Sequence, residues 1–145
     1  MFVALSLSIS FSALAEADTK LDYAVRLWQS CIEEGAIAST NLNEPPSVLV
    51  DFVTARCRWQ KSQVTDAIAS IGAAFSIQPH DDRVESLQRS FSADTLHAPL
   101  NAIGAARYRC IHGLSQDNQD DVPVDATNFA TAPACDWTRQ NSENR

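Results

Sequence analysis

The sequence lacks several features on which functional assignments usually rest. Its 11 lysines and arginines are outnumbered by 18 aspartates and glutamates, which gives a formal net charge of −7. An acidic surface repels phosphate groups, so nucleic acids and anionic lipids are disfavoured as partners. The chain contains no C-x-x-C motif for a thioredoxin-like redox site and no G-x-S-x-G nucleophile motif. We therefore expect no nucleic-acid partner, and nothing in the sequence indicates a cofactor.

Only one long apolar run is present, and it is short for a membrane span. Residues 2–14 are apolar or serine and uncharged, whereas a span needs about 20 apolar residues. Ala13-Leu14-Ala15 and Ala15-Glu16-Ala17 follow as small-x-small cleavage patterns. We interpret residues 1–17 as a secretory signal peptide, although no lysine or arginine precedes the apolar run. The alternative is a buried N-terminal helix of a cytoplasmic protein. After signal removal we expect no membrane segment.

Four cysteines are present: Cys31, Cys57, Cys110 and Cys135. An even number in an exported protein points to two disulfides, and four cysteines allow three pairings. Cys31 lies 13 residues before Glu44, and Cys57 lies 13 residues after it. Two helices folded back at Glu44 would bring these cysteines level, which favours Cys31–Cys57 and leaves Cys110–Cys135 as the second pair.

Apolar residues at three-and-four spacing predict helices over residues 19–39 and 46–73, joined by a proline turn in which Asn43 is the expected cap. The predicted inner faces consist of Leu21, Ala24, Val25, Trp28, Cys31 and Ile32, and of Leu49, Val53, Cys57, Val64, Ile68 and Ile71. A break around Pro79 precedes a short third helix, which Asp82 would cap. A fourth helix runs from Pro99 to about Leu114, where Gly113 is the expected stop.

After residue 114 the composition becomes acidic. Asp117, Gln119, Asp121 and Asp125 have partial EF-hand spacing, but valine stands where glycine is needed and asparagine where a bidentate glutamate is expected. We therefore expect a solvated loop without calcium. The fold class predicted is all-α: a small bundle of about four helices (18–114), built on a disulfide-stapled helical hairpin, with an irregular C-terminal segment (115–145).

No set of side chains points to catalysis. The histidines His80, His97 and His112 do not occur three or four residues apart, so a zinc site is not expected. Glu33 and Glu34 are predicted on a solvated face, and no pair of carboxylates stands out. Cysteines at helical seam positions in an oxidising compartment are most simply structural. We therefore expect no catalytic residue and no metal ligand.

The three tryptophans each lie within a few residues of a cysteine. Packing beside a disulfide is the simpler interpretation of Trp28, Trp59 and Trp137. The alternative is a contact in a binding surface, where tryptophan and arginine are favoured. Trp59, together with Phe52 on the same flank of the second helix, is the candidate for such an interaction surface.

The stretch from Tyr23 to Ala69 resembles a pattern of small exported proteins of Gram-negative bacteria. In that pattern an early helix carries an aromatic residue and then a cysteine, as in Trp28-Gln29-Ser30-Cys31. A second helix carries a cysteine flanked by alanine, arginine and large residues, as in Ala55-Arg56-Cys57-Arg58-Trp59. The resemblance covers about a third of the chain. It implies export and carries over neither an activity nor a site residue.

The sequence thus predicts a periplasmic or secreted protein. The favoured hypothesis is a non-enzymatic binding or inhibitor module whose partner is another envelope or secreted protein. An exposed apolar patch around Trp59 or Phe52 would support it. The alternative is a small envelope-acting enzyme such as a hydrolase, which requires a cleft with convergent carboxylate or histidine side chains.

Overall fold

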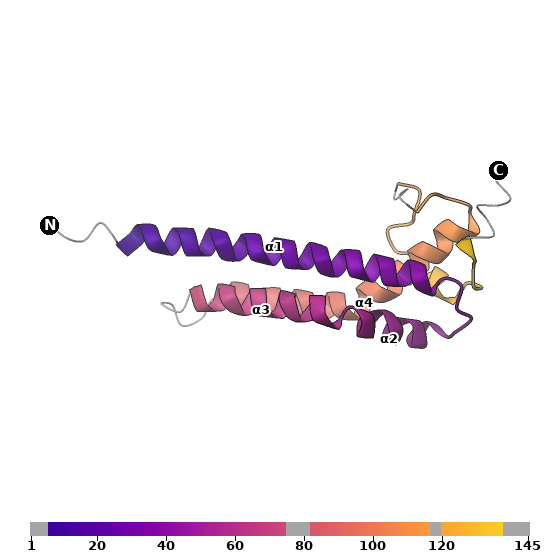
Figure 1. Ribbon diagram of the computed structural model, residues 1–145, viewed down its shortest axis with the longest axis horizontal. Coiled ribbons are helices and arrows are strands. Elements are labelled where there is room, and N and C mark those ends of the chain that lie inside the picture. Colours follow the sequence, from indigo (N-terminus) through magenta and orange to yellow (C-terminus); the bar gives the residue numbers. More distant parts are fainter. Residues whose placement is uncertain (1–5, 75–81, 117–119, 138–145) are drawn as a thin grey trace. The chain divides into compact units, whose positions relative to one another are not determined.

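A computed structural model describes residues 6–74, 82–116 and 120–137, with side chains from Ala15 onward (Figure 1). These residues form α1 (Ser6–Ser39), α2 (Pro46–Arg56), α3 (Arg58–Ala74), α4 (Asp82–Ile111) and the 3₁₀ helix η1 (Thr127–Thr131). No strand occurs among them. The predicted all-α class is therefore confirmed. None of the described helices combines the length and the apolar character that crossing a bilayer requires.

The chain divides into two compact units. Unit 1 comprises residues 1–29 and 58–93, and unit 2 comprises residues 30–57 and 94–145. The boundaries between the units after residues 29 and 93 fall inside α1 (Ser6–Ser39) and α4 (Asp82–Ile111). Each of these two helices therefore contributes residues to both units.

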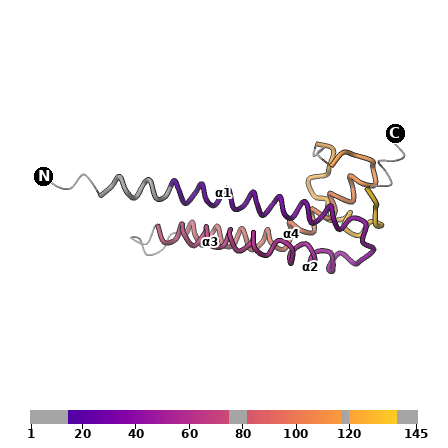
Figure 2. Tube along the Cα trace, in the orientation of Figure 1, coloured from indigo at the N-terminus to yellow at the C-terminus, as the bar shows by residue number. Residues whose placement is uncertain are grey.

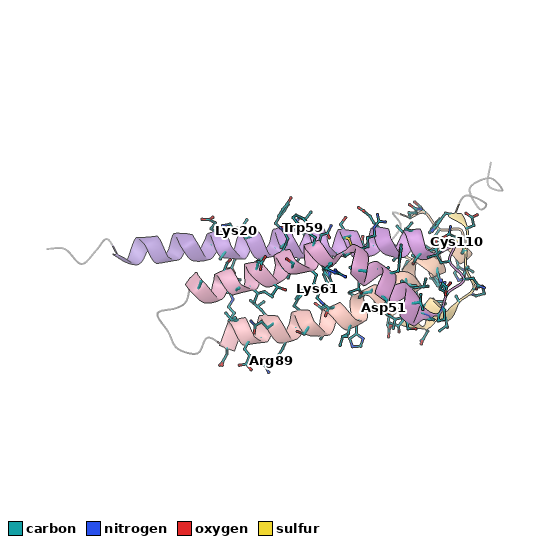
Figure 3. All side chains as sticks on the ribbon, turned by 60° about the horizontal axis from the view of Figure 1, so that its bottom comes forward. Lys20, Asp51, Trp59, Lys61, Arg89 and Cys110 are labelled. Carbon is teal, nitrogen blue, oxygen red and sulfur yellow. A yellow bond between two sulfur atoms is a disulfide. The ribbon has the colours of Figure 1, made fainter. Side chains whose placement is uncertain are left out.

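Unit 1 is a bundle of three helical segments, from α1, α3 and α4, which lie side by side in Figures 1 and 3. Its core is formed by apolar side chains that are almost fully buried: Ala24, Trp28, Val64, Ile68 and Ile71. The Trp28 and Phe91 rings meet edge to face with their centroids 5.1 Å apart. The Asp18 carboxylate pairs with Arg83 Nη2 at 2.7 Å, which joins the beginning of α4 to α1.

Unit 2 combines the end of α1, α2, the last turns of α4 and the irregular chain that follows (Figure 2). Two disulfides hold it together: Cys31–Cys57 with a Cα–Cα distance of 5.8 Å, and Cys110–Cys135 with a Cα–Cα distance of 6.1 Å. Both predicted pairings are confirmed. Leu49, Val53 and Ile103 are buried at 1% exposure or less.

The proline turn between α1 and α2 is closed by backbone and hydroxyl hydrogen bonds. α1 ends at Ser39, as predicted, and the Ser39 and Thr40 hydroxyls donate to the carbonyls of Ala36 and Ile37, both at 2.8 Å. The prediction that Asn43 caps the second helix is wrong: Pro45 is the N-cap, with no side-chain cap. The Pro45 carbonyl accepts from the backbone N–H groups of Val48 and Leu49, at 3.0 and 3.2 Å.

The second predicted helix is interrupted at one residue. Cys57 has φ −96° and ψ 15°, outside the helical region, and separates α2 from α3. Its N–H still donates to the Val53 carbonyl at 3.1 Å, so the interruption keeps that helical hydrogen bond. Periodicity alone does not reveal such a break, because the apolar stripe continues across it: Val53, Cys57 and Val64 are all buried.

The third and fourth predicted helices are one helix. α4 runs from Asp82 to Ile111 and contains Pro99, which was predicted to begin a new helix. Proline in a helix interior removes one backbone hydrogen bond and normally bends or ends the helix. Here the Pro99 ring is itself a fully buried core side chain. The predicted stop is correct, because Gly113 has a φ of 66° two residues after α4 ends.

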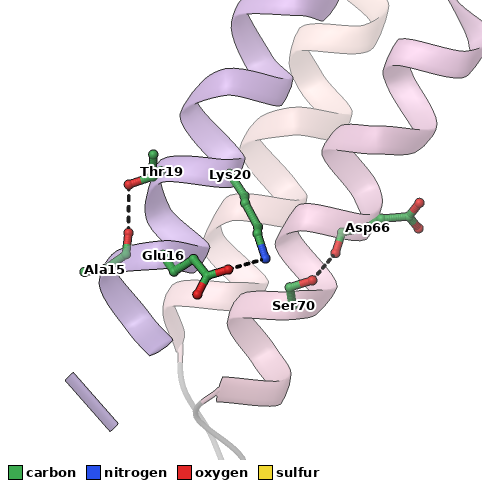
Figure 4. A network of polar contacts seen from close by, with 6 residues as sticks. All are labelled: Ala15, Glu16, Thr19, Lys20, Asp66 and Ser70. Atoms are coloured by element: carbon green, nitrogen blue, oxygen red, sulfur yellow. Dashed lines mark hydrogen bonds and ion pairs between the residues drawn. The ribbon is translucent and has the colours of Figure 1, made fainter. Parts of the chain in front are cut away.

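Residues 6–17 of the predicted signal segment belong to α1. Around the expected cleavage site, the Thr19 hydroxyl donates to the Ala15 carbonyl at 2.9 Å, and Lys20 pairs with Glu16 at 2.7 Å (Figure 4). The hydrogen bond from Lys20, aided by its charge, lowers the pKa of the Glu16 carboxyl. Residues 15–20 are thus regular helix, and the signal peptide stays a prediction.

Candidate functional site

The outer face of α2 is the first candidate surface. Val48 and Phe52, one helical turn apart, are 47% and 42% exposed. On the adjacent face of the same helix, about 100° around its axis, Leu49 and Val53 are 1% and 0% exposed. The apolar surface of α2 is therefore wider than its buried stripe, because it continues onto the exposed flank that Val48 and Phe52 form. We call the exposed Val48 and Phe52 side chains the α2 outer face.

This face is presented by a helix that is fixed at both ends. Pro45 and Pro46 restrict the backbone where α2 begins. Cys57 follows its last residue and is bonded to Cys31 on α1. Along its inner side α2 packs closely on α1, since a Cβ placed on Gly35 would lie 3.2 Å from a Val53 methyl. A partner would therefore meet an ordered surface, which lowers the entropy cost of binding.

Trp59 is the second exposed aromatic that the sequence singled out. It lies on α3 in unit 1, and 63% of its surface is exposed, so the favoured interpretation as a packed core residue is wrong (Figure 3). Trp28 is 3% exposed and does pack in the core, as predicted. Phe52 belongs to unit 2. The structure therefore presents Trp59 and Phe52 as two separate exposed aromatics.

Arg107 holds together three segments of unit 2, a role that sequence reasoning missed. The residue is 3% exposed, and its guanidinium donates to the carbonyl oxygens of Ala130, Ala132 and Leu42 at 2.7, 2.6 and 2.9 Å. Burial lowers the pKa of this group. The available signal was its position between Ile103 and Cys110 on the apolar face of α4. A charged residue there needs buried acceptors, which backbone carbonyls supply.

The segment before η1 is attached to α4 by a further hydrogen bond, from backbone to side chain. The Ala126 N–H donates to Asn101 Oδ1 at 2.7 Å. Asp125 accepts from both the backbone N–H and the hydroxyl of Thr127, at 3.0 and 2.7 Å. These hydrogen bonds, with a smaller contribution from the charge of His97, lower the pKa of the Asp125 carboxyl. Asp125 thus orders the beginning of η1.

The residues weighed as metal ligands do not converge where the structure describes them. His97 and His112 are exposed, and the described residues contain no group of three histidine, cysteine, aspartate or glutamate side chains placed to hold a metal ion. His80, Asp117 and Gln119 lie outside the described residues. The His112 ring instead contacts Tyr108, with a centroid distance of 4.3 Å.

Unit 1 contains a pocket of about 300 Å³ between α3 and α4. It is lined by uncharged residues: Thr65, Ile68, Gln88, Phe91 and Ser92. The hydrolase hypothesis requires convergent carboxylate or histidine groups, and this lining does not supply them. The pocket therefore offers hydrogen bonds and apolar contact but no group for acid–base chemistry.

Comparison with known proteins adds no assignment to this geometry. The two disulfides fit a location outside the cytoplasm. No protein-family model matches the chain, and neither a curated protein sequence nor a solved structure matches it.

Proposed function

We propose that the protein is a non-enzymatic binding module of the bacterial envelope, periplasmic or secreted, which docks a partner protein on the α2 outer face. The observation that carries this proposal is the pair Val48 and Phe52, exposed on the flank of a helix whose adjacent face is buried. Apolar side chains one turn apart are the kind of anchor that fills a pocket on a partner.

Two further features support the proposal. The helix ends are restrained by prolines and by the Cys31–Cys57 disulfide, so binding immobilises little. The net charge of −7 keeps the protein soluble and favours a partner of opposite charge. The exposed Trp59 offers a separate contact in unit 1 and is not needed for the α2 outer face to act.

Site-specific photo-crosslinking in the native envelope tests the proposal. A photoreactive residue replaces Phe52 in one variant and Glu33, an exposed polar residue of α1, in the control. We expect a discrete adduct with another envelope or secreted protein from position 52 and none from position 33. Adding Val48→Asp should abolish the adduct, because a carboxylate would then have to be buried at the interface.

The outcomes separate binding from incidental proximity. Equal adducts from positions 52 and 33, or an adduct that persists with Val48→Asp, would refute the α2 outer face as the docking site. An adduct of twice the mass of the chain would show self-association in place of a partner protein. Circular dichroism of each variant confirms that the helices are retained.

A further inference from the structure

The pocket of unit 1 lies where α3 and α4 run side by side in opposite directions (Figure 3). Gly72 of α3 faces Val84 of α4, since a Cβ placed on Gly72 would lie 3.7 Å from both Val84 methyls. One turn away from this contact come Ile68 on α3 and Gln88 on α4, and both line the pocket. The lining residues therefore belong to facing turns of two packed helices.

The least exposed lining residues, Ile68 and Phe91, form what we call the floor of the pocket. Ile68 is 3% exposed, and Phe91 is half-buried. The Phe91 ring meets the buried Trp28 ring edge to face, with the centroids 5.1 Å apart. The floor is thus held in place by the core of unit 1. A molecule that covers this apolar surface gains free energy by removing it from water.

The other three lining residues form what we call the rim, and all are exposed, polar and uncharged: Thr65, Gln88 and Ser92. The Thr65 hydroxyl donates its hydrogen to the Lys61 carbonyl at 3.2 Å, so its oxygen can accept a hydrogen bond from a ligand. The Gln88 amide carries both donors and an acceptor. The rim can therefore bind a hydroxyl or an amide group, whereas no lining residue can compensate a charge.

The volume of the pocket limits the size of a ligand. A cavity of about 150 Å³ is large enough for benzene, and the pocket measures about 300 Å³. Clefts that bind small molecules begin at about this volume. The pocket therefore has room for a single ring that carries a short polar substituent.

We propose that the pocket between α3 and α4 binds a small uncharged molecule of about one ring in size. Its apolar face covers Ile68 and Phe91, and its hydroxyl or amide group forms hydrogen bonds with the rim. A charged ligand is disfavoured, because it would lose hydration here without meeting an opposite charge. This site belongs to unit 1 and is additional to the docking of a partner protein on the α2 outer face, which belongs to unit 2.

Carbon-13 NMR of the disulfide-bonded protein tests the proposal with three probes that share one aromatic ring: benzamide, benzoate and benzylammonium. We expect benzamide to shift the Ile68 methyl and Phe91 ring signals together, with one Kd of about 10 mM or tighter. Nuclear Overhauser effects should connect the benzamide ring to the Ile68 methyl groups. The signals of Ile103, which is fully buried in unit 2, should stay in place.

The two charged probes, compared at constant ionic strength, separate the pocket from the charge of the whole chain. The net charge of −7 attracts cations and repels anions at long range. The uncharged lining instead predicts that benzoate and benzylammonium both bind more weakly than benzamide, by about fivefold or more. If either ion binds as tightly as benzamide, the assignment to uncharged ligands is wrong.

Variants at exposed positions decide whether the response comes from the pocket. Gln88→Met keeps the length of the side chain but removes its amide, so benzamide should bind about twofold to tenfold more weakly. Gln29→Met, at an exposed position of α1 outside the lining, is the matched control.

Thr65→Phe should fill the space above the floor and abolish the benzamide shifts. Ser70→Phe is its control, because Ser70 is also exposed on α3 but does not line the pocket. Shifts that grow linearly with benzamide, saturable binding that survives Thr65→Phe, or an unchanged affinity in Gln88→Met would overturn the site. Saturation that is lost in Thr65→Phe and retained in Ser70→Phe and Gln29→Met would establish it.

Discussion

At the scale of single residues, Gly104 shows how closely the C-terminal segment approaches α4. A Cβ at this position would overlap the Ala126 carbonyl oxygen and lie 2.7 Å from its carbon. Both atoms belong to backbone, so no side-chain rotation relieves the overlap. We expect Gly104→Ala to lower the free energy of unfolding by about 2–3 kcal/mol, as overpacking of a core typically does.

Gly72→Ala is the matched control, measured by the same urea denaturation. Gly72 is also helical, and its added Cβ would meet only Val84 methyls at 3.7 Å, an ordinary contact. Alanine favours helix over glycine by up to about 1 kcal/mol, so this variant should be unchanged or more stable. Equal effects of the two substitutions would contradict the close approach at Gly104.

A second prediction at this scale concerns the contribution of Arg107 to stability. Arg107→Met removes a guanidinium that donates hydrogen bonds to the carbonyls of Ala130, Ala132 and Leu42. Methionine fills much of the same space but has no hydrogen-bond donor. We expect a loss of about 2–4 kcal/mol in the free energy of unfolding, because partners of a charged donor are left unsatisfied. Amide exchange should accelerate in residues 126–135, which the arginine attaches to α4.

The exposed Arg58 provides the control, and Arg58→Met should change stability by less than about 0.5 kcal/mol. If Arg107→Met unfolds at the same urea concentration as wild type, the carbonyl contacts contribute no net stability. Faster exchange confined to residues 126–135 would still show that the arginine orders this segment.

At the scale of elements, the two disulfides allow a direct comparison. They close loops of nearly equal length, with separations of 26 and 25 residues. In the chain-entropy model each contributes about 3–4 kcal/mol by restricting the unfolded chain. The double variants Cys31→Ala/Cys57→Ala and Cys110→Ala/Cys135→Ala should therefore lose similar amounts in chemical denaturation. A loss below about 0.5 kcal/mol for the first pair would refute its role in holding the hairpin.

The sequence predicted helix faces better than helix ends. The buried stripe from Leu49 to Ile71 and the seam position of Cys31 are confirmed, because burial follows the helical period directly. The break at Cys57 and the continuity of α4 through Pro99 were missed, since tertiary packing overrides these local signals. Gly35 lies inside α1, where a Cβ would come 3.2 Å from a Val53 methyl.

The candidate sites were less predictable from the sequence than the fold. Phe52 and Trp59, the candidates for an interaction surface, are both exposed, although packing was the favoured interpretation of Trp59. The role of Arg107 was not found, since it depends on carbonyls of segments 23 to 65 residues away. Helical periodicity carries no information about such backbone partners.

At the scale of the whole molecule, the predicted export determines how much of α1 belongs to the mature protein. Cleavage after Ala17 would remove the exposed Glu16–Lys20 ion pair, and exposed pairs of this kind contribute little to stability. It would retain the Asp18–Arg83 pair and the buried Trp28. Of the buried apolar residues described in unit 1, cleavage would therefore remove Ala17 and keep Ala24, Trp28, Val64, Ile68 and Ile71.

We expect the full-length chain, produced in a Gram-negative host, to accumulate in the periplasm with Asp18 as its first residue and all four cysteines oxidised. N-terminal sequencing and non-reducing peptide mapping measure both features on the same sample. Ala17→Leu places a large side chain where signal cleavage needs a small one, so this variant should keep residues 1–17. A wild-type chain that retains Met1 and carries free thiols would contradict export. The proposed envelope partner would then be excluded, because docking on the α2 outer face presupposes a helix fixed by an oxidised Cys31–Cys57 pair.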